Sequence, residues 1–257
     1  MQNNVLSLLM AIVPVFLYSF LVYFIIPEGH VSQRRARRYL ITGFTAPMLV
    51  YALHYMFPIL HVQIDSLSPV KVFGCDAFLQ TGLVEEICKF ITFWWVFSQR
   101  RSAIHDLPIA TIYYCMMASA GFALVENISY LMHYGNEVLF SRAISAIVLH
   151  MICGIVMGYY IQKGFSKITM TEKYSLVEIL KMKFHKWKHI ITGIIMATTI
   201  HGVYDFNLSL PLNLYSDIFL YVILFFGLFI GKFMIYESIR ISGELRSKNY
   251  NKDLEYF

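Results

Sequence analysis

Charged side chains interrupt apolar stretches of this sequence. Placing a charge in such a stretch costs free energy, so these residues are candidates for a functional role. Glu85 and Glu86 are adjacent, and Lys89 follows within the same apolar stretch. A charged group at the centre of a bilayer costs at least ~2.5–3.5 kcal/mol on insertion scales. On a helix Lys89 is three and four residues from the glutamates, so it can pair with either of them. The other glutamate then stays free for chemistry.

Three later apolar stretches each carry further polar residues of the same kind. The first contains the dipeptide Glu126-Asn127, and the second contains His150. The third contains His201, followed at the next helical turn by Asp205, which can orient the imidazole. Such residues in membrane helices usually face the interior of the bundle or a water-filled cavity. We therefore expect these residues to belong to one functional site.

Carboxylates and histidines around a wet cavity support two kinds of hydrolytic chemistry. In a metal-free site, a glutamate takes a proton from water while a histidine helps to activate that water or stabilises an oxyanion. Alternatively, two histidines and a carboxylate bind zinc, with another glutamate as the base. The candidate metal ligands are His150, His201 and Glu126, with the Glu85–Glu86 pair as another source of the carboxylate. The metal-free form is mildly favoured, because Lys89 places a positive charge one turn from the glutamates.

Composition indicates that lipid surrounds these stretches. The 257 residues are 58% hydrophobic and 14% charged, whereas average chains are about 45–50% apolar and about 25% charged. Seven stretches are long enough to span a bilayer, which takes roughly 20 residues. They lie near residues 5–26, 39–60, 73–98, 108–132, 142–162, 189–208 and 217–237. The sequence thus predicts an all-α, polytopic membrane protein of about seven transmembrane helices, in a single domain over residues 1–257.

Lysine and arginine set the expected orientation, because they favour the cytoplasmic side. Alternate connections and the tail hold 17 of the 21 basic residues, in residues 34–38, 100–101, 163–188 and 240–252. The opposite side has only Lys71 and Arg142. We therefore expect the amino terminus outside and the carboxyl terminus in the cytoplasm. The basic residues form no continuous face, so nucleic acid is not an expected partner.

Depth along the predicted spans supports a single site. At 1.5 Å per residue, Glu85 lies ~18 Å from the outer end of its span, and Glu126 ~9 Å from the end of its own. The corresponding depths are ~12 Å for His150 and ~10 Å for His201. All four fall in the outer half of the bilayer, which predicts a shared cavity open to the extracytoplasmic side.

Leu176–Trp187 forms an amphipathic run, which we expect to be a separate surface helix. His54 is expected to make an interhelical hydrogen bond.

Four ordered motifs resemble those of the PrsW family of intramembrane proteases. E-E-x-x-K is met at Glu85–Lys89, F-x-x-x-E-N at Phe122–Asn127, H-x-x-x-G at His150–Gly154 and H-x-x-x-D at His201–Asp205. The resemblance covers about residues 70–210, the motif-bearing core, and four motifs in order are more specific than any one alone. The related CAAX-processing and bacteriocin-immunity proteases carry E-E-x-x-x-R and F-x-x-x-H. The chain departs from those patterns by having Lys89 and Glu126.

The resemblance implies peptide-bond hydrolysis, with a membrane-anchored anti-sigma factor cut first on its extracytoplasmic side. By analogy Glu85 is the expected base and Glu86 the partner of Lys89, although the two glutamates can exchange these roles. Glu126 and His150 would help to position or activate the water, with Asn127 in support, and His201 with Asp205 would stabilise the oxyanion. The expected partners are a single-pass membrane protein and the lipid bilayer, at the plasma membrane of a bacterium, with no certain cofactor and zinc as the candidate.

Two other functions use similar residues. A proton-coupled transporter or a membrane sensor would also keep ionisable groups at depth, but the sequence shows no inverted repeat or pair of broken helices. Lys89 and Glu126 argue against a peptidase for prenylated or bacteriocin peptides, because they depart from the related family's motifs. A membrane protease is therefore the favoured function.

The basic asymmetry generates a prediction about topology. In a background without the four natural cysteines, a cysteine at Asn3 should react with an impermeant thiol reagent in intact cells, and one at Thr171 should not. Permeabilised cells supply the control, in which both positions should react. Labelling of Thr171→Cys in intact cells would reverse the orientation and with it the outward-opening site.

Overall fold

The structure is a computed structural model and describes residues 4–56, 69–99, 108–136, 139–165, 176–210 and 214–254. Every element in these ranges is helical. In chain order they are α1 (Asn4–Ile25), α2 (Gln33–Gly43), α3 (Thr45–Met56), α4 (Pro69–Cys75), the π-helical segment η2 (Asp76–Leu83), α5 (Val84–Ser98), α6 (Pro108–Tyr134), α7 (Leu139–Ile144), α8 (Ala146–Phe165), α9 (Leu176–Ser209) and α10 (Leu214–Leu254).

These elements form helical stretches at each of the seven expected positions. Within these described ranges, four helices are long and apolar enough to cross a membrane: Val5–Ile25, Pro108–Tyr134, Leu139–Phe165 and Ile218–Ser247. The all-α class is therefore confirmed for the described residues, and so is a membrane protein, while the number of spans and their orientation stay predictions. The basic residues Arg100 and Arg101 lie outside the described ranges, as do residues 166–175 of the basic 163–188 connection.

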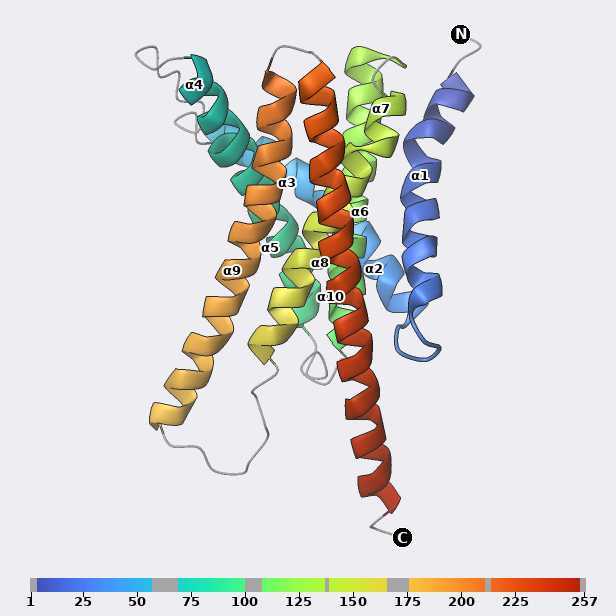
Figure 1. The fold of residues 1–257 in the computed structure, drawn as a ribbon, viewed down its shortest axis with the longest axis vertical. Coiled ribbons are helices and arrows are strands. Elements are labelled where there is room, and N and C mark those ends of the chain that lie inside the picture. Colours follow the sequence, from blue (N-terminus) through green and yellow to red (C-terminus); the bar gives the residue numbers. More distant parts are fainter. Residues whose placement is uncertain are drawn as a thin grey trace.

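The run Leu176–Trp187 is helical as expected, but it is not separate from the span that follows it. This run is the first part of α9, which continues without interruption to Ser209 (Figure 1). The run contains no proline or glycine, and the first glycine of α9 is Gly193, so nothing in the sequence breaks the helix there. At 1.5 Å per residue, α9 is about 50 Å long, which exceeds the ~30 Å hydrocarbon core.

Helices α6 and α8 form the centre of the bundle. The other helices surround this pair, and the apolar parts of α1 and α10 leave most of their residues exposed (Figure 1). Exposed apolar side chains such as Phe24, Phe225 and Phe229 suit contact with lipid. Buried residues of α6 and α8 make up much of the main apolar core.

Two glycines allow α6 and α8 to approach closely. A Cβ atom on Gly154 would lie 2.8 Å from the Cα of Met116, and one on Gly158 would lie 2.7 Å from the Cα of Ile112. Glycines four residues apart on one helix face are a common means of close packing in membranes. Because Gly154 lies one turn after His150, this contact also holds the histidine against α6.

The π-helical segment η2 leads directly into the helix that bears the paired glutamates. Short π-helical segments often occur at functional sites, where they change the direction of the following side chains. A Cβ atom on Gly82 would lie 3.3 Å from the backbone nitrogen of Gly202, and one on Gly202 would meet the ring of Phe78 at 2.4 Å. These two glycines let α9 lie against η2, which brings His201 close to Glu85 and Glu86.

Helix α3 packs apart from the main core. A break at Phe44 separates it from α2, and Pro47 lacks the amide hydrogen that would otherwise continue the helical hydrogen bonds across the break. Ala46 and Val50 join a small apolar cluster of their own, with residues from α5 and α6. His54 Nε2 lies 3.1 Å from the carbonyl oxygen of Gln80 in η2, which confirms the expected interhelical hydrogen bond.

Candidate active site

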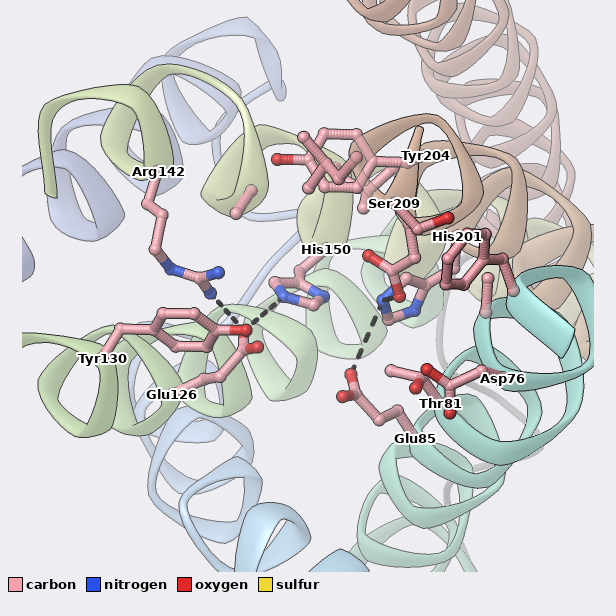
Figure 2. Close-up of a pocket in the computed structure, with 16 residues that line it drawn as sticks. Asp76, Thr81, Glu85, Glu126, Tyr130, Arg142, His150, His201, Tyr204 and Ser209 are labelled. Carbon is pink, nitrogen blue, oxygen red and sulfur yellow. Dashed lines mark hydrogen bonds and ion pairs between the residues drawn. The ribbon is translucent and has the colours of Figure 1, made fainter. Parts of the chain in front are cut away.

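The four sequence motifs converge on one point inside the bundle. Figure 2 shows His150 and His201 facing each other, with Glu126 and Glu85 below them on different helices. The two imidazole centroids are 5.1 Å apart, in an edge-to-face arrangement. The predicted gathering of these residues into one site is therefore present in the structure.

Lys89 is the central cation of the site. Its ammonium nitrogen lies 2.7 Å from Glu86 Oε1, 3.4 Å from Glu85 Oε2 and 2.9 Å from His150 Nδ1. The ring of Phe122 lies on a further side, with its centroid 4.1 Å from Nζ. The side chain is 1% exposed, so these contacts replace the solvation that a buried ammonium loses.

The two glutamates differ in their surroundings. Glu86 is fully buried and accepts hydrogen bonds from Lys89 and from His201, whose Nδ1 lies 2.9 Å from Oε1. Glu85 has the longer contact with Lys89, lines a cavity and lies 3.6 Å from His201 Nε2. Glu86 is thus held on two sides, whereas Glu85 faces the open space.

Three carboxylates lie close to the ring nitrogens of His201. Nδ1 faces Glu86, while Nε2 faces both Glu85 and Asp205, whose Oδ2 is 3.3 Å away. Because an ionised carboxylate only accepts hydrogen bonds, the contact with Glu86 places a proton on Nδ1. The predicted pairing of His201 with the residue one turn later is present.

His150 is fixed at both ring nitrogens. Its Nδ1 faces Lys89, and its Nε2 lies 2.7 Å from Glu126 Oε2. The same carboxylate oxygen lies 2.7 Å from Nη2 of Arg142, at the end of α7. The Nε of Arg142 donates a hydrogen bond to Asn127 Oδ1 at 2.9 Å, which explains why the motif contains both a glutamate and an asparagine.

A cavity of about 280 Å³ borders the site. Glu85, Glu126, Arg142, His150 and His201 line its inner wall, together with Asp205. The exposed residues Leu208 and Ser209 lie at its rim, at the end of α9. The cavity therefore opens at the end of the bundle where α4 begins and α9 ends, which is the upper end in Figure 1.

Comparison with known proteins agrees with this geometry. Residues 35–231 match the family described as "PrsW family intramembrane metalloprotease". The chain belongs to the PrsW family.

Relatives of known name are all moderately similar to the chain. Protease PrsW of Oceanobacillus iheyensis is 29% identical over 164 residues, which are 63% of this chain and 68% of that protein. Protease PrsW of Geobacillus kaustophilus is 28% identical over 169 residues, 65% of this chain and 67% of that protein. Protease PrsW of Bacillus subtilis is 32% identical over 158 residues, covering 60% and 64% of the two chains. No solved structure matches the chain.

The resemblance read from the motifs is therefore confirmed, and the chain is a membrane peptidase. The alternative of a proton-coupled transporter or sensor has no support in these relatives, which are named as proteases. The PrsW match extends beyond the motif-bearing core of about residues 70–210 into α2 and α10.

The family description raises the question of whether the site can hold a metal ion. Glu85, His150 and His201 each offer one ligand atom, and these atoms lie within 4.8 Å of one another. Two histidines with one carboxylate form a known catalytic zinc set. The carboxylate in this group is that of Glu85, whereas Glu126 was the first candidate from the sequence.

Charge and hydrogen bonding give different answers about the fit of a dication. If both imidazoles are neutral, the site contains two cations and four carboxylates. The cations are Lys89 and Arg142, and the carboxylates are those of Glu85, Glu86, Glu126 and Asp205. This excess of negative charge suits a dication. However, His150 already contacts Lys89 through Nδ1 and Glu126 through Nε2. The donor types fit a metal ion, but binding by all three residues would displace one of these partners of His150.

Sequence reasoning missed Arg142 as part of the PrsW site. It was counted among the few basic residues on the outer side, because it lies at the start of an apolar stretch. In the structure its guanidinium carbon lies 3.6 Å from the centroid of the Tyr130 ring, and it contacts both polar residues of the α6 motif. The available signal was its spacing, since Arg142 precedes His150 by about two helical turns and so shares its face.

Arg142 should therefore position the catalytic groups of this PrsW protein. Arg142→Gln should lower kcat about 10–100-fold, the range typical for groups that orient a catalytic residue, because Glu126 loses its partner and no longer fixes His150. Arg142→Lys keeps the charge without the planar fork and should retain part of the activity. The matched control is Arg240→Gln, which removes an exposed ion pair with Glu244 on α10. Equal kcat values for Arg142→Gln and Arg240→Gln would exclude a positioning role.

Proposed function

We propose that this protein is an intramembrane endopeptidase that hydrolyses a single-pass membrane protein near the extracytoplasmic side, as in the first cut of an anti-sigma factor. The observation that carries the proposal is the position of Glu85. It is the glutamate of the pair that lines the cavity, and both histidines lie beside it. A carboxylate at the end of a buried network, facing a cavity, is well placed to act on water.

In the proposed reaction Glu85 is the general base. Its carboxylate takes a proton from a water molecule in the cavity, and the water oxygen attacks the carbonyl carbon of the scissile peptide bond. The same group then passes the proton to the leaving amide nitrogen, so that no proton is lost from the site. Glu86 is the partner of Lys89, at 2.7 Å. Because the ammonium group makes this close contact with Glu86, it does not neutralise Glu85.

The histidines supply the remaining functions. His150, fixed between Lys89 and Glu126, positions the attacking water, and Asn127 supports this arrangement through Arg142. His201 is the proposed oxyanion donor from Nε2, since Glu86 holds the proton on Nδ1 and Asp205 lies at Nε2 to balance the charge of the protonated ring. Such preorganised donors act strongly in a site from which bulk water is excluded.

The cellular setting is part of the proposal. We place seven spans in the bacterial plasma membrane, with the amino terminus outside and the whole of residues 1–257 as one membrane-embedded domain. Opposite the mouth of the cavity, Lys186 Nζ lies 5.4–5.8 Å from the ring centroids of Trp187, Phe165 and Trp94. Aromatic and basic residues together are typical of the cytoplasmic interface, which supports a cavity open to the outside.

A zinc-dependent mechanism is the second candidate. The convergence of Glu85, His150 and His201 and the family description favour it. A zinc ion in such a site acts as a Lewis acid toward the substrate carbonyl group. Glu86 on His201 and Glu126 on His150 would then orient the two imidazoles. The contact of Lys89 with His150 makes the metal-free form our preference.

The carboxylates provide the direct test of the proposed activity. A panel of single-pass membrane proteins, anti-sigma factors included, is reconstituted with the purified enzyme, and cuts are mapped by mass spectrometry. Glu85→Gln and Glu86→Gln should each reduce cleavage strongly at unchanged expression, since general-base catalysis typically contributes about 10²–10⁴-fold. The control is Glu237→Gln, a half-buried glutamate on α10 that accepts a hydrogen bond from Tyr159, remote from the site. Native rates for both site variants would exclude this active site.

Metal analysis separates the two mechanisms. The metal-free mechanism predicts that active, purified enzyme contains zinc well below one ion per chain and keeps its activity after chelation. Stoichiometric zinc, loss of activity on chelation and its return with added zinc would establish the second candidate. In that case His150→Ala and His201→Ala should also lower the zinc content, which Glu237→Gln should not.

A further inference from the structure

A second, lateral cavity of about 200 Å³ lies between α3 and α6. Pro47, Val50, Tyr51 and His54 of α3 form one side, and Phe122, Val125 and Ser129 belong to the α6 side. Tyr51 lies at its outer edge and is 62% exposed. This cavity therefore faces sideways from the bundle, unlike the cavity at the end of the helices.

The lateral cavity and the main cavity meet at the proposed catalytic groups. Glu85, Glu126 and Tyr130 line both of them, so these side chains form a wall that is reached from two directions. Sites for ligands commonly have volumes of about 300–1,000 Å³, and each cavity alone is smaller than that. A ligand that extends from one cavity into the other would pass directly over Glu85 and Glu126.

The lining suits a peptide backbone better than a lipid chain. A peptide in the bilayer needs partners for its N–H and C=O groups, because lipid supplies none. Tyr51, His54, Ser129 and Tyr130 bring hydroxyl and imidazole groups to this lateral cavity, while Val50 and Val125 supply apolar surface for side chains. By contrast, the groove between α1, α8 and α10 has about 480 Å³ and an almost wholly apolar lining, as expected for lipid.

The contact between α3 and α6 at the mouth of the lateral cavity is a weak one. The hydroxyl groups of Tyr51 and Ser129 are 3.3 Å apart, at an exposed position. Helix α3 packs through its own small apolar cluster, and the break at Phe44 separates it from α2. The wall on this side can therefore widen without disturbance of the α6–α8 centre.

We propose that the lateral cavity is the entry and binding site for the substrate. An extended segment of a single-pass membrane protein lies between α3 and α6 and continues into the main cavity, so that the scissile bond sits at the shared wall of Glu85 and Glu126. Water reaches the same wall from the open end of the bundle. This inference rests on the proposed function, because it places the substrate against the proposed catalytic groups.

Site-specific photo-crosslinking tests the route independently of cleavage. p-Benzoylphenylalanine replaces Tyr51 at the lateral cavity or, as the matched control, Phe225 in the α1–α8–α10 groove, both in the Glu85→Gln background. The two side chains are aromatic and similarly exposed, at 62% and 66%. The same panel of single-pass proteins should crosslink at position 51 and not at position 225. Equal crosslinking at both positions, or crosslinking at 225 alone, would overturn the lateral route.

Filling the cavity gives the functional test. Val125→Trp should lower cleavage of the panel substrates about 10–100-fold by misplacing the peptide, whereas Val148→Trp, in the α1–α8–α10 groove, should leave it unchanged. Thermal stability in detergent should be similar for both, which separates blocking from misfolding. Full activity of a stable Val125→Trp enzyme would exclude this entry route while leaving the proposed function intact. Native cleavage rates in both Glu85→Gln and Glu86→Gln would instead refute the proposed function.

Discussion

The ammonium group of Lys89 organises the centre of this protein. A buried cation is costly, and removing one partner of such a group leaves an unpaired charge that destabilises a protein by roughly 3–5 kcal/mol. Lys89 meets this cost with contacts to Glu85, Glu86, His150 and the ring of Phe122. These partners come from α5, α6 and α8, and Glu86 adds His201 from α9. The helices must therefore take one relative arrangement before the charge is satisfied, which also sets the geometry of the proposed catalytic groups.

Backbone packing makes this arrangement possible. Gly154 and Gly158 bring α8 onto α6, where His150 contacts Glu126, and Gly82 and Gly202 bring α9 onto η2, close to where His201 contacts Glu86. Each polar contact thus accompanies a neighbouring glycine contact. The result is asymmetric for the paired glutamates, since Glu86 is enclosed and Glu85 faces two cavities. Glu85 and Glu86 are adjacent on α5 and of the same type, and yet they lie in different environments.

Much of the site could be predicted from the sequence, because membrane depth and helical spacing restrict where a charged residue can lie. Glu85, Glu126, His150 and His201 belong to different stretches at comparable depth, and the structure brings them together. Arg142 escaped notice because a basic residue at the end of a span is normally explained by the interface. The continuity of α9 was missed because amphipathicity was taken as a sign of a surface position, although no residue in Leu176–Trp187 breaks a helix.

Other features depend on tertiary packing and have no local signal. The π-helical turns of η2 and the separate packing of α3 follow from contacts between distant segments, so the lateral cavity could not be anticipated. The choice between Glu85 and Glu86 as the cavity-lining residue likewise depends on how the neighbouring helices pack against α5. Spacing along one helix gives both residues access to Lys89, and only the positions of α6 and α9 distinguish them.

The pairing within α5 also bears on how the chain enters the membrane. During synthesis α5 emerges before α6, α8 and α9, so Glu85, Glu86 and Lys89 must partition into lipid before either histidine is present. Their spacing lets Lys89 pair with one carboxylate and lie near the other along a single helix face, so that only one net negative charge remains at that stage. Lys89 thus lowers the cost of inserting α5 into lipid, since a helix with two unpaired carboxylates would insert poorly.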